Sequence, residues 1–127
     1  MSTILVVDDE LSNLELLEYL LSRSGHKVVV ALGGRVGLDK AHEIRPDLIV
    51  IDLHMPGMDG WELAQRIRRD AVLADTRLLA VSMGPATTTG AREAGFDGFF
   101  PMPFEPGDLM RTVDVILSDG PPVADTS

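Results

Sequence analysis

Acidic residues follow two of the apolar stretches in this chain, and they are the residues best suited to chemistry. Asp8 and Asp9 come directly after the apolar run 3–7, and Asp52 ends a second apolar run at 47–52. Carboxylates that are brought close together repel one another and resist full ionisation unless a cation joins them. Oxygen ligands without cysteine or histidine side chains suit a hard, octahedral ion. If the fold brings the three acids together, the pattern predicts a site for Mg²⁺ or Mn²⁺.

A solvated turn or a helix cap would explain one isolated pair of acids equally well. The acid at the end of a second, separate apolar run is what favours a cation site, and Glu10 is expected to face solvent. Two other residues are candidates at the same place. The hydroxyl of Ser82 can donate a hydrogen bond to an oxyanion, and the backbone carbonyl of His54 could supply another oxygen to a metal.

The elements that must position these residues are short β-branched runs alternating with helical patterns. Strands are expected at 3–7, 27–31, 47–52, 77–82 and 98–100. Helices are expected at 12–23, at a segment through 36–41, and at 60–69, 87–94 and 105–119. Such a series predicts an α/β fold, a doubly wound (βα)5 unit of flavodoxin-like type with a five-stranded parallel sheet in the order 2-1-3-4-5. In these sheets ligands lie beyond the carboxyl ends of the strands, which is where the acids stand.

Length and composition limit the classes of protein that are possible. The chain has 127 residues, which predicts one domain at 1–118 and a disordered C-terminal tail at 119–127. A formal charge of −9 disfavours a general nucleic-acid binder and suits cations or a basic partner. Since the sequence has no cysteine, no signal peptide pattern and no apolar stretch of membrane-spanning length, a cytoplasmic location without membrane contact is expected.

Several segments together resemble the receiver domain of two-component response regulators. They are ILVVDDE, DLIVIDLHMPGMDGWEL, Ser82 and EAGFDGFFPMPF. The likeness covers about residues 1–117, and DLHMPGMDG is its most specific part. The pair SN at 12–13 is similar to receivers of hybrid kinases and single-domain regulators.

The resemblance implies that Asp52 accepts a phosphoryl group from a histidine kinase or a histidine phosphotransfer protein. Asp9 and Asp52, with the backbone carbonyl of His54, would bind Mg²⁺, and Asp8 would act through water. The signal would pass by docking to a downstream protein target, so that the chain is expected to be a signalling module and not an enzyme.

The resemblance also identifies a switch hydroxyl at Ser82, a switch aromatic at Phe99, and one clear departure. Met102 stands where the family has a lysine whose ammonium pairs with the acceptor aspartate. Methionine carries no charge and donates no hydrogen bond, so we expect Met102 to face the acids and to leave them one cation short. No other cation is expected to replace it: Lys27 is expected at the opposite end of the sheet and Lys40 on the second helix. Arg35, in the loop after the second strand, is expected at the acidic end but too far across the sheet.

A second group of departures lies between Ser82 and Gly95, where the segment is about two residues shorter than in typical receivers. Met83 replaces a small residue and could narrow the approach to Asp52. The fourth helix is weakened by three residues: Gly84, Pro85 and Gly90. The family's usual output face is therefore expected to be altered.

Three other functions compete with a phosphorylated receiver. An atypical pseudo-receiver would bind proteins without phosphorylation, as Met102 suggests. An aspartyl phosphohydrolase of the haloacid-dehalogenase type is less favoured, because Asp8 and Glu10 fit its motif poorly and no catalytic lysine or cap insertion is present. A flavodoxin that binds flavin is disfavoured because the acidic first loop would repel a phosphate.

Overall fold

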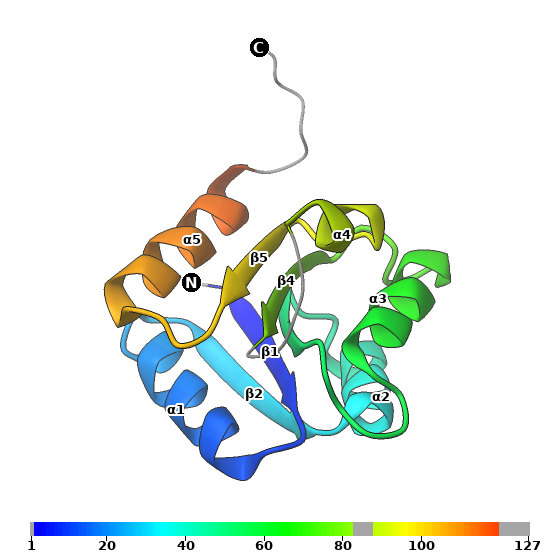
Figure 1. The fold of residues 1–127 in the computed structure, drawn as a ribbon, viewed down its shortest axis with the longest axis horizontal. Helices are drawn as coiled ribbons and strands as arrows, with labels where there is room; N and C mark the ends of the chain where they lie inside the picture. Colours follow the sequence, from blue (N-terminus) through cyan, green and yellow to red (C-terminus); the bar gives the residue numbers. More distant parts are fainter. Residues whose placement is uncertain (1, 83–87, 120–127) are drawn as a thin grey trace.

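The computed structural model describes residues 2–82 and 88–119 (Figure 1). Strands and helices alternate along these residues in the predicted order. They are β1 (Thr3–Asp8), α1 (Leu11–Ser22), β2 (Lys27–Leu32), α2 (Gly34–Ile44), β3 (Leu48–Asp52), α3 (Gly60–Arg69), β4 (Arg77–Ser82), α4 (Thr88–Glu93), β5 (Gly98–Pro101) and α5 (Pro106–Asp119). None of the helices in the described ranges is long and apolar enough to cross a membrane.

The five strands form one sheet in the order β2-β1-β3-β4-β5, with every neighbouring pair parallel. This confirms the predicted fold class and strand order. The strand order reverses between β1 and β3, so the carboxyl ends of these two strands flank the crevice in which such sheets bind ligands.

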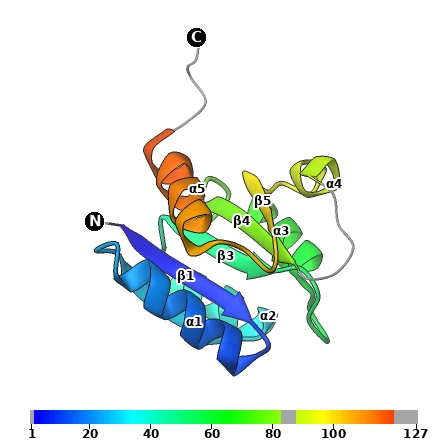
Figure 2. The ribbon, with the colours of Figure 1, turned by 60° about the vertical axis from the view of Figure 1, so that its left-hand side comes forward.

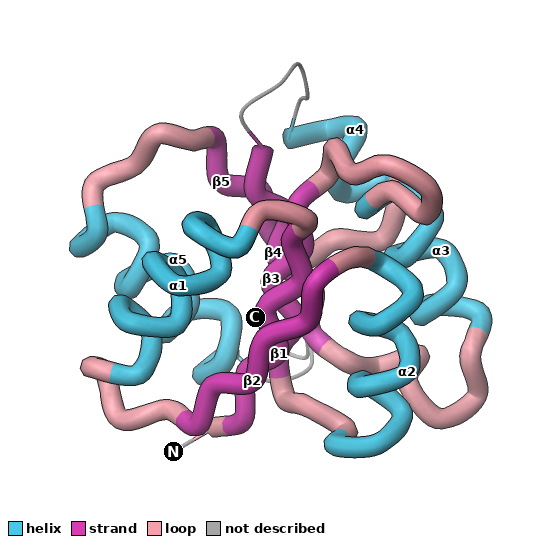
Figure 3. Tube along the Cα trace, turned by 90° about the horizontal axis from the view of Figure 1, so that it is seen from below, coloured by secondary structure: helices cyan, strands magenta, loops and turns pink. Residues whose placement is uncertain are grey.

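Helices cover both faces of the sheet, as Figures 2 and 3 show. On one face α1 and α5 contribute Leu14, Leu17, Leu21, Leu109, Val113 and Ile116 to an apolar cluster with the strands. On the other face α2, α3 and α4 contribute Ala41, Leu63, Ala64, Ile67 and Ala91 to a second cluster. Because the strands are covered on both sides, their sequences are continuous apolar runs with no polar alternation.

The structure differs from the sequence-based boundaries at a few positions. Asp47 was predicted to begin a strand, but β3 begins at Leu48, and the Asp47 carboxylate instead accepts a hydrogen bond from the Thr3 amide at 2.8 Å. Arg35 was placed in a loop but belongs to the first turn of α2. The predictions for Met83, Gly84 and Pro85, and for the tail beyond Asp119, concern segments outside the described residues.

A guanidinium group ties the amino end of β4 to the helices around it. Arg68, near the end of α3, donates from its side chain to four acceptors: Gly95 O at 2.9 Å, Ala74 O at 2.8 Å, Thr76 O at 2.6 Å and the Asp97 carboxylate at 3.1 Å. The same carboxylate accepts from the Leu78 amide at 2.8 Å. Asp97 is thus held by a charge-assisted pair at the end of the sheet opposite Asp52.

Candidate functional site

The acids at the carboxyl ends of β1 and β3 lie together. The two strands are neighbours and Val7 pairs with Ile51, so the next residues in register are Asp8 and Asp52. Asp9 follows in the loop that leads to α1. Carboxylate oxygens of the three acids all lie within 4.8 Å of one another. The predicted convergence of these residues is therefore confirmed.

Burial and the repulsion between neighbouring acids make Asp8 and Asp52 hard to ionise. Asp8 is 1% exposed, and burial is the main cause that raises its pKa above the ordinary value, with Asp9 adding to the effect. Asp52 is half-buried, and burial together with the charge on Asp8 raises its pKa to about 7. Desolvation and like charge both disfavour the ionised form, so a cation that joined these groups would release protons near neutral pH.

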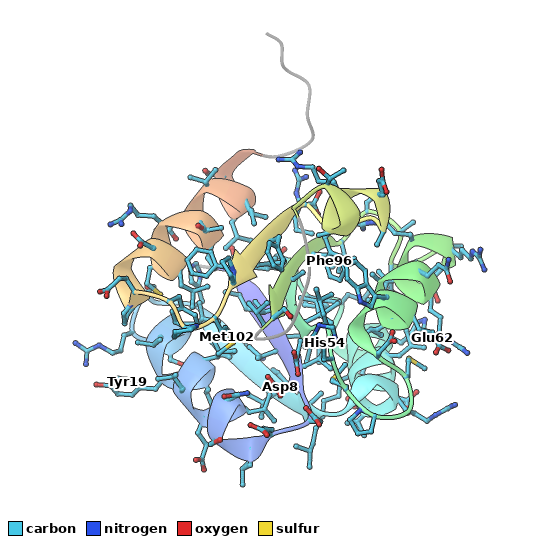
Figure 4. All side chains as sticks on the ribbon, in the orientation of Figure 1. Asp8, Tyr19, His54, Glu62, Phe96 and Met102 are labelled. Carbon is cyan, nitrogen blue, oxygen red and sulfur yellow. The ribbon has the colours of Figure 1, made fainter. Side chains whose placement is uncertain are left out.

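Three hydrogen bonds hold the acidic side chains in place. Asp8 accepts from the backbone amide of Glu10 at 2.9 Å and from the side-chain amide of Asn13 at 3.3 Å. Asp52 accepts from the backbone amide of His54 at 3.3 Å. Figure 4 shows Asp8 and His54 at this edge of the sheet. Sequence reasoning missed the role of Asn13; its place in the first turn after the acidic loop was the available signal.

The loop after β3 fixes the backbone of Asp52 against the start of α3. Leu53 donates to Val81 O at 3.0 Å, and the Gly60 amide donates back to Leu53 O at 3.0 Å. A Cβ atom at Gly60 would lie 2.4 Å from the Asp52 carbonyl oxygen, so only glycine permits this approach. Asp59 caps α3 by accepting from the Glu62 amide at 2.8 Å. The exposed His54 side chain projects from this loop.

The switch candidates lie on β4 and β5, on the far side of β3 from Asp8. Ser82 ends β4 and is 2% exposed, and its carbonyl accepts from the Met102 amide at 2.8 Å. Phe99 is half-buried and packs against the apolar cluster on the α2, α3 and α4 face. Ser82 therefore lies at the acidic edge, and Phe99 lies on a strand that leads to this edge.

Met102 follows β5 at the same edge of the sheet, where Figure 4 labels it. Its side chain is half-buried and packs against the apolar cluster beneath α1 and α5. Lys27 begins β2 at the other end of the sheet, and the ammonium of Lys40 donates to Val30 O at 2.7 Å. Among the residues that the structure describes, no lysine or arginine forms an ion pair with Asp8, Asp9 or Asp52.

The donor set fits a hard divalent cation. It consists of three carboxylates, two of which have raised pKa values, with oxygen atoms close enough to share one ion. Oxygen-only ligands favour Mg²⁺, Mn²⁺ or Ca²⁺ over softer metals. The same geometry can stabilise charge on an oxyanion bound beside the cation.

Comparisons with known protein sequences give the family. The sequence model described as "Response regulator receiver domain" matches residues 4–114. The chain is 37% identical over 114 residues to the alkaline phosphatase synthesis transcriptional regulatory protein PhoP of Bacillus subtilis, covering 90% of this chain and 48% of that protein. It is 35% identical over 120 residues to the transcriptional regulatory protein AfsQ1 of Streptomyces coelicolor, covering 94% and 53%. The chain spans about half the length of these curated relatives.

Solved structures agree with this assignment. The chemotaxis protein CheY4 of Vibrio cholerae superposes with a TM-score of 0.85 at 29% identity, covering 91% of this chain and 98% of that one. A putative response regulator from Chloroflexus aurantiacus gives 0.87 at 30% identity, with 92% and 98% covered. The signal receiver domain of a histidine kinase from Syntrophus aciditrophicus gives 0.86 at 25% identity, with 100% and 98% covered. From its sequence and its fold alike, the chain belongs to the family of response regulator receiver domains.

Proposed function

We propose that Asp52 accepts a phosphoryl group, and that the chain acts in this way as the receiver of a two-component or phosphorelay system. The observation that carries the proposal is the cluster of three carboxylates within 4.8 Å of one another, with Asp52 at the end of β3. Family membership supports it, because receiver domains are signalling modules. The phosphoryl donor is a phosphohistidine of a histidine kinase or of a histidine phosphotransfer protein.

In the proposed reaction an Asp52 carboxylate oxygen attacks the phosphorus atom of the donor. The new P–O bond forms as the P–N bond to the donor imidazole breaks, and the electron pair returns to that nitrogen, which is then protonated. The product is an acyl phosphate. Hydrolysis later breaks the P–O bond, releases inorganic phosphate and restores the carboxylate, so that the signal is reset. Most of the catalysis is positioning and charge stabilisation, as in other phosphoryl transfers.

Asp8, Asp9 and Asp52, with the His54 backbone carbonyl, are the groups that would hold Mg²⁺. When bound, the cation supplies the positive charge that offsets the charge on the phosphoryl oxygens. Without it, the raised pKa of about 7 keeps much of Asp52 protonated at neutral pH and therefore unable to attack. The chain's part is to fix the three carboxylates, with Asp8 acting on the cation through water.

Ser82 and Phe99 are the residues proposed to report phosphorylation. The Ser82 hydroxyl, at the end of the strand beside β3, would donate to an oxygen of the phosphoryl group. This hydrogen bond would move the end of β4. The movement would be passed to β5, because the Met102 amide donates to the Ser82 carbonyl and Phe99 lies on β5. A downstream protein would recognise the altered surface.

The relatives named as transcriptional regulators are about twice as long as this chain.

Incubation with a small phosphodonor and Mg²⁺, read by intact mass, tests the proposal. We expect the mass of one phosphoryl group to be added, and we expect EDTA or Asp52→Ala to prevent it. Asp75→Ala, an exposed acid at the other end of the sheet, is the matched control and should be phosphorylated like the unmodified chain. A partner that binds equally well with and without the donor, and equally well to Asp52→Ala, would instead favour the phosphorylation-independent receiver suggested by Met102.

A further inference from the structure

Asn13 is the residue at the acidic edge whose role the family assignment leaves open. It lies in the first turn of α1 and is half-buried. Its side-chain amide nitrogen donates to Asp8 Oδ2 at 3.3 Å, while the Glu10 backbone amide donates to Asp8 Oδ1 at 2.9 Å. Both oxygens of the Asp8 carboxylate are thus engaged, one from each side, and its orientation about the χ2 bond is fixed.

The helix itself does not need this hydrogen bond. Glu10 is the N-cap residue of α1, and its side chain makes no capping hydrogen bond. Asn13 does not cap the helix either, because its side-chain amide reaches back across the loop to β1. Asn13 donates to Asp8 from its side chain, whereas Glu10 and His54 donate to Asp8 and Asp52 from backbone amides. The contact therefore serves the acidic cluster rather than the start of the helix.

A neutral donor is suited to a cluster that must attract a cation. A lysine would orient a carboxylate but would also cancel its charge, and Met102 brings neither effect. An amide orients Asp8 and leaves its negative charge intact. Partners that orient a metal ligand commonly change metal affinity by about 10–100-fold when they are removed.

We infer that Asn13 is a positioning residue that holds Asp8 toward Asp9 and Asp52 and thereby sets how tightly the cluster binds a divalent cation. The inference rests on the proposed function, because it assumes that this cluster holds Mg²⁺ for phosphoryl transfer to Asp52. It adds a residue that is not itself a metal ligand, Asn13, and proposes that this residue orients one of the acids, Asp8.

A double-mutant cycle between Asn13 and Asp8 tests the inference. Calorimetry with Mg²⁺ alone would compare the unmodified chain with Asn13→Ala, Asp8→Asn and the double variant, and Ser12→Ala, an exposed neighbour in the same turn, is the control. We expect Asn13→Ala to weaken Mg²⁺ binding by about tenfold, Ser12→Ala to change nothing, and Asn13→Ala to have no further effect once Asp8 is Asn.

Phosphoryl uptake as a function of Mg²⁺ gives a second readout that a merely structural role would not produce. Asn13→Ala should raise the Mg²⁺ concentration for half-maximal uptake by the same factor, with the rate at saturating Mg²⁺ unchanged. Unaltered Mg²⁺ affinity in Asn13→Ala, or an equal loss in the Asp8→Asn background, would overturn the inference while leaving the proposed function standing. If the unmodified chain accepts a phosphoryl group without binding Mg²⁺, the inference about Asn13 fails and phosphoryl transfer to Asp52 stands. If the chain neither accepts a phosphoryl group nor binds Mg²⁺, the inference and the proposed function both fail.

Discussion

The two ends of the parallel sheet carry acids of the same kind in opposite electrostatic settings. At the amino end Asp97 receives hydrogen bonds from the Arg68 guanidinium and from a backbone amide. At the carboxyl end Asp8 and Asp52 face one another, and they accept from two backbone amides and the neutral Asn13 side chain. At the carboxyl end burial, with the like charge of neighbouring acids, raises the pKa values of Asp8 and Asp52. A compensated acid stabilises the fold, whereas an uncompensated cluster marks the site of chemistry.

Removal of Arg68 should give the largest loss of stability, because it removes four side-chain hydrogen bonds from the compensated end of the sheet. Arg68→Ala would remove the Arg68 donor from three backbone carbonyls and from Asp97, which would keep the Leu78 amide and the Arg77 ion pair at 3.9 Å. Breaking such a network costs about 3 kcal/mol, which urea denaturation would measure. Arg69→Ala, an exposed neighbour on the same helix, is the control. A loss below about 1 kcal/mol would mean that water replaces the guanidinium easily.

Gly60→Ala attacks the backbone that supports Asp52. The added Cβ would lie 2.4 Å from the Asp52 carbonyl oxygen and 2.7 Å from the Leu53 Cα. Overpacking against backbone costs about 2 kcal/mol, and we expect phosphoryl uptake to fall as well, since Asp52 must shift. Gly107→Ala is the matched control, because a Cβ there would meet only the end of the Arg111 side chain at 3.5 Å. Equal stability of the two variants would show that the loop after β3 can shift without a loss of stability.

The contrast between the two ends also shows how far sequence reasoning reaches. Apolar runs ending in acids predicted both the sheet and the meeting of Asp8 with Asp52, because parallel strands end at one edge. The same reasoning could not find the four acceptors of Arg68, since they come from segments that only the packed helices bring together. Asn13 was missed for a related reason: whether a first-turn side chain reaches back to the strand depends on the angle between helix and sheet. Asp47 lies just before β3, where its carboxylate accepts from the Thr3 amide, a contact that the apolar pattern does not reveal.

Asp52→Asn should stabilise the metal-free protein, and the gain should grow with pH. An acid whose pKa is raised in the folded state stabilises the fold at low pH, and that stability is lost as pH rises from about 4 to about 7. The full shift would correspond to about 4 kcal/mol, which solvent screening at this half-buried group reduces to about 1.5 kcal/mol. Asn keeps the acceptor for the His54 amide but carries no charge.

Denaturation in EDTA at pH 5 and at pH 8 checks this expectation, with Asp75→Asn as the exposed control. The unmodified chain should be less stable at pH 8 than at pH 5, and Asp52→Asn should recover most of the difference. If Asp52→Asn is no more stable than the unmodified chain at pH 8, the acids at this end are already compensated, and the contrast between the two ends is lost.

Met102→Lys is the smallest change, and it probes the missing cation directly. Mg²⁺ should raise the melting temperature of the unmodified chain, because a ligand that binds only the folded state stabilises it. At ten times the dissociation constant, the free energy of unfolding should rise by about 1.4 kcal/mol. An ammonium from residue 102 would neutralise part of the cluster, so we expect Met102→Lys to melt higher in EDTA, to gain less from Mg²⁺, and to take up phosphoryl groups faster. Met110→Lys is the control, because Met110 packs against the same apolar cluster but lies on α5. If both lysine variants behave alike, the effect comes from lost packing. If neither changes the Mg²⁺ shift or the uptake, charge at this position does not limit the site.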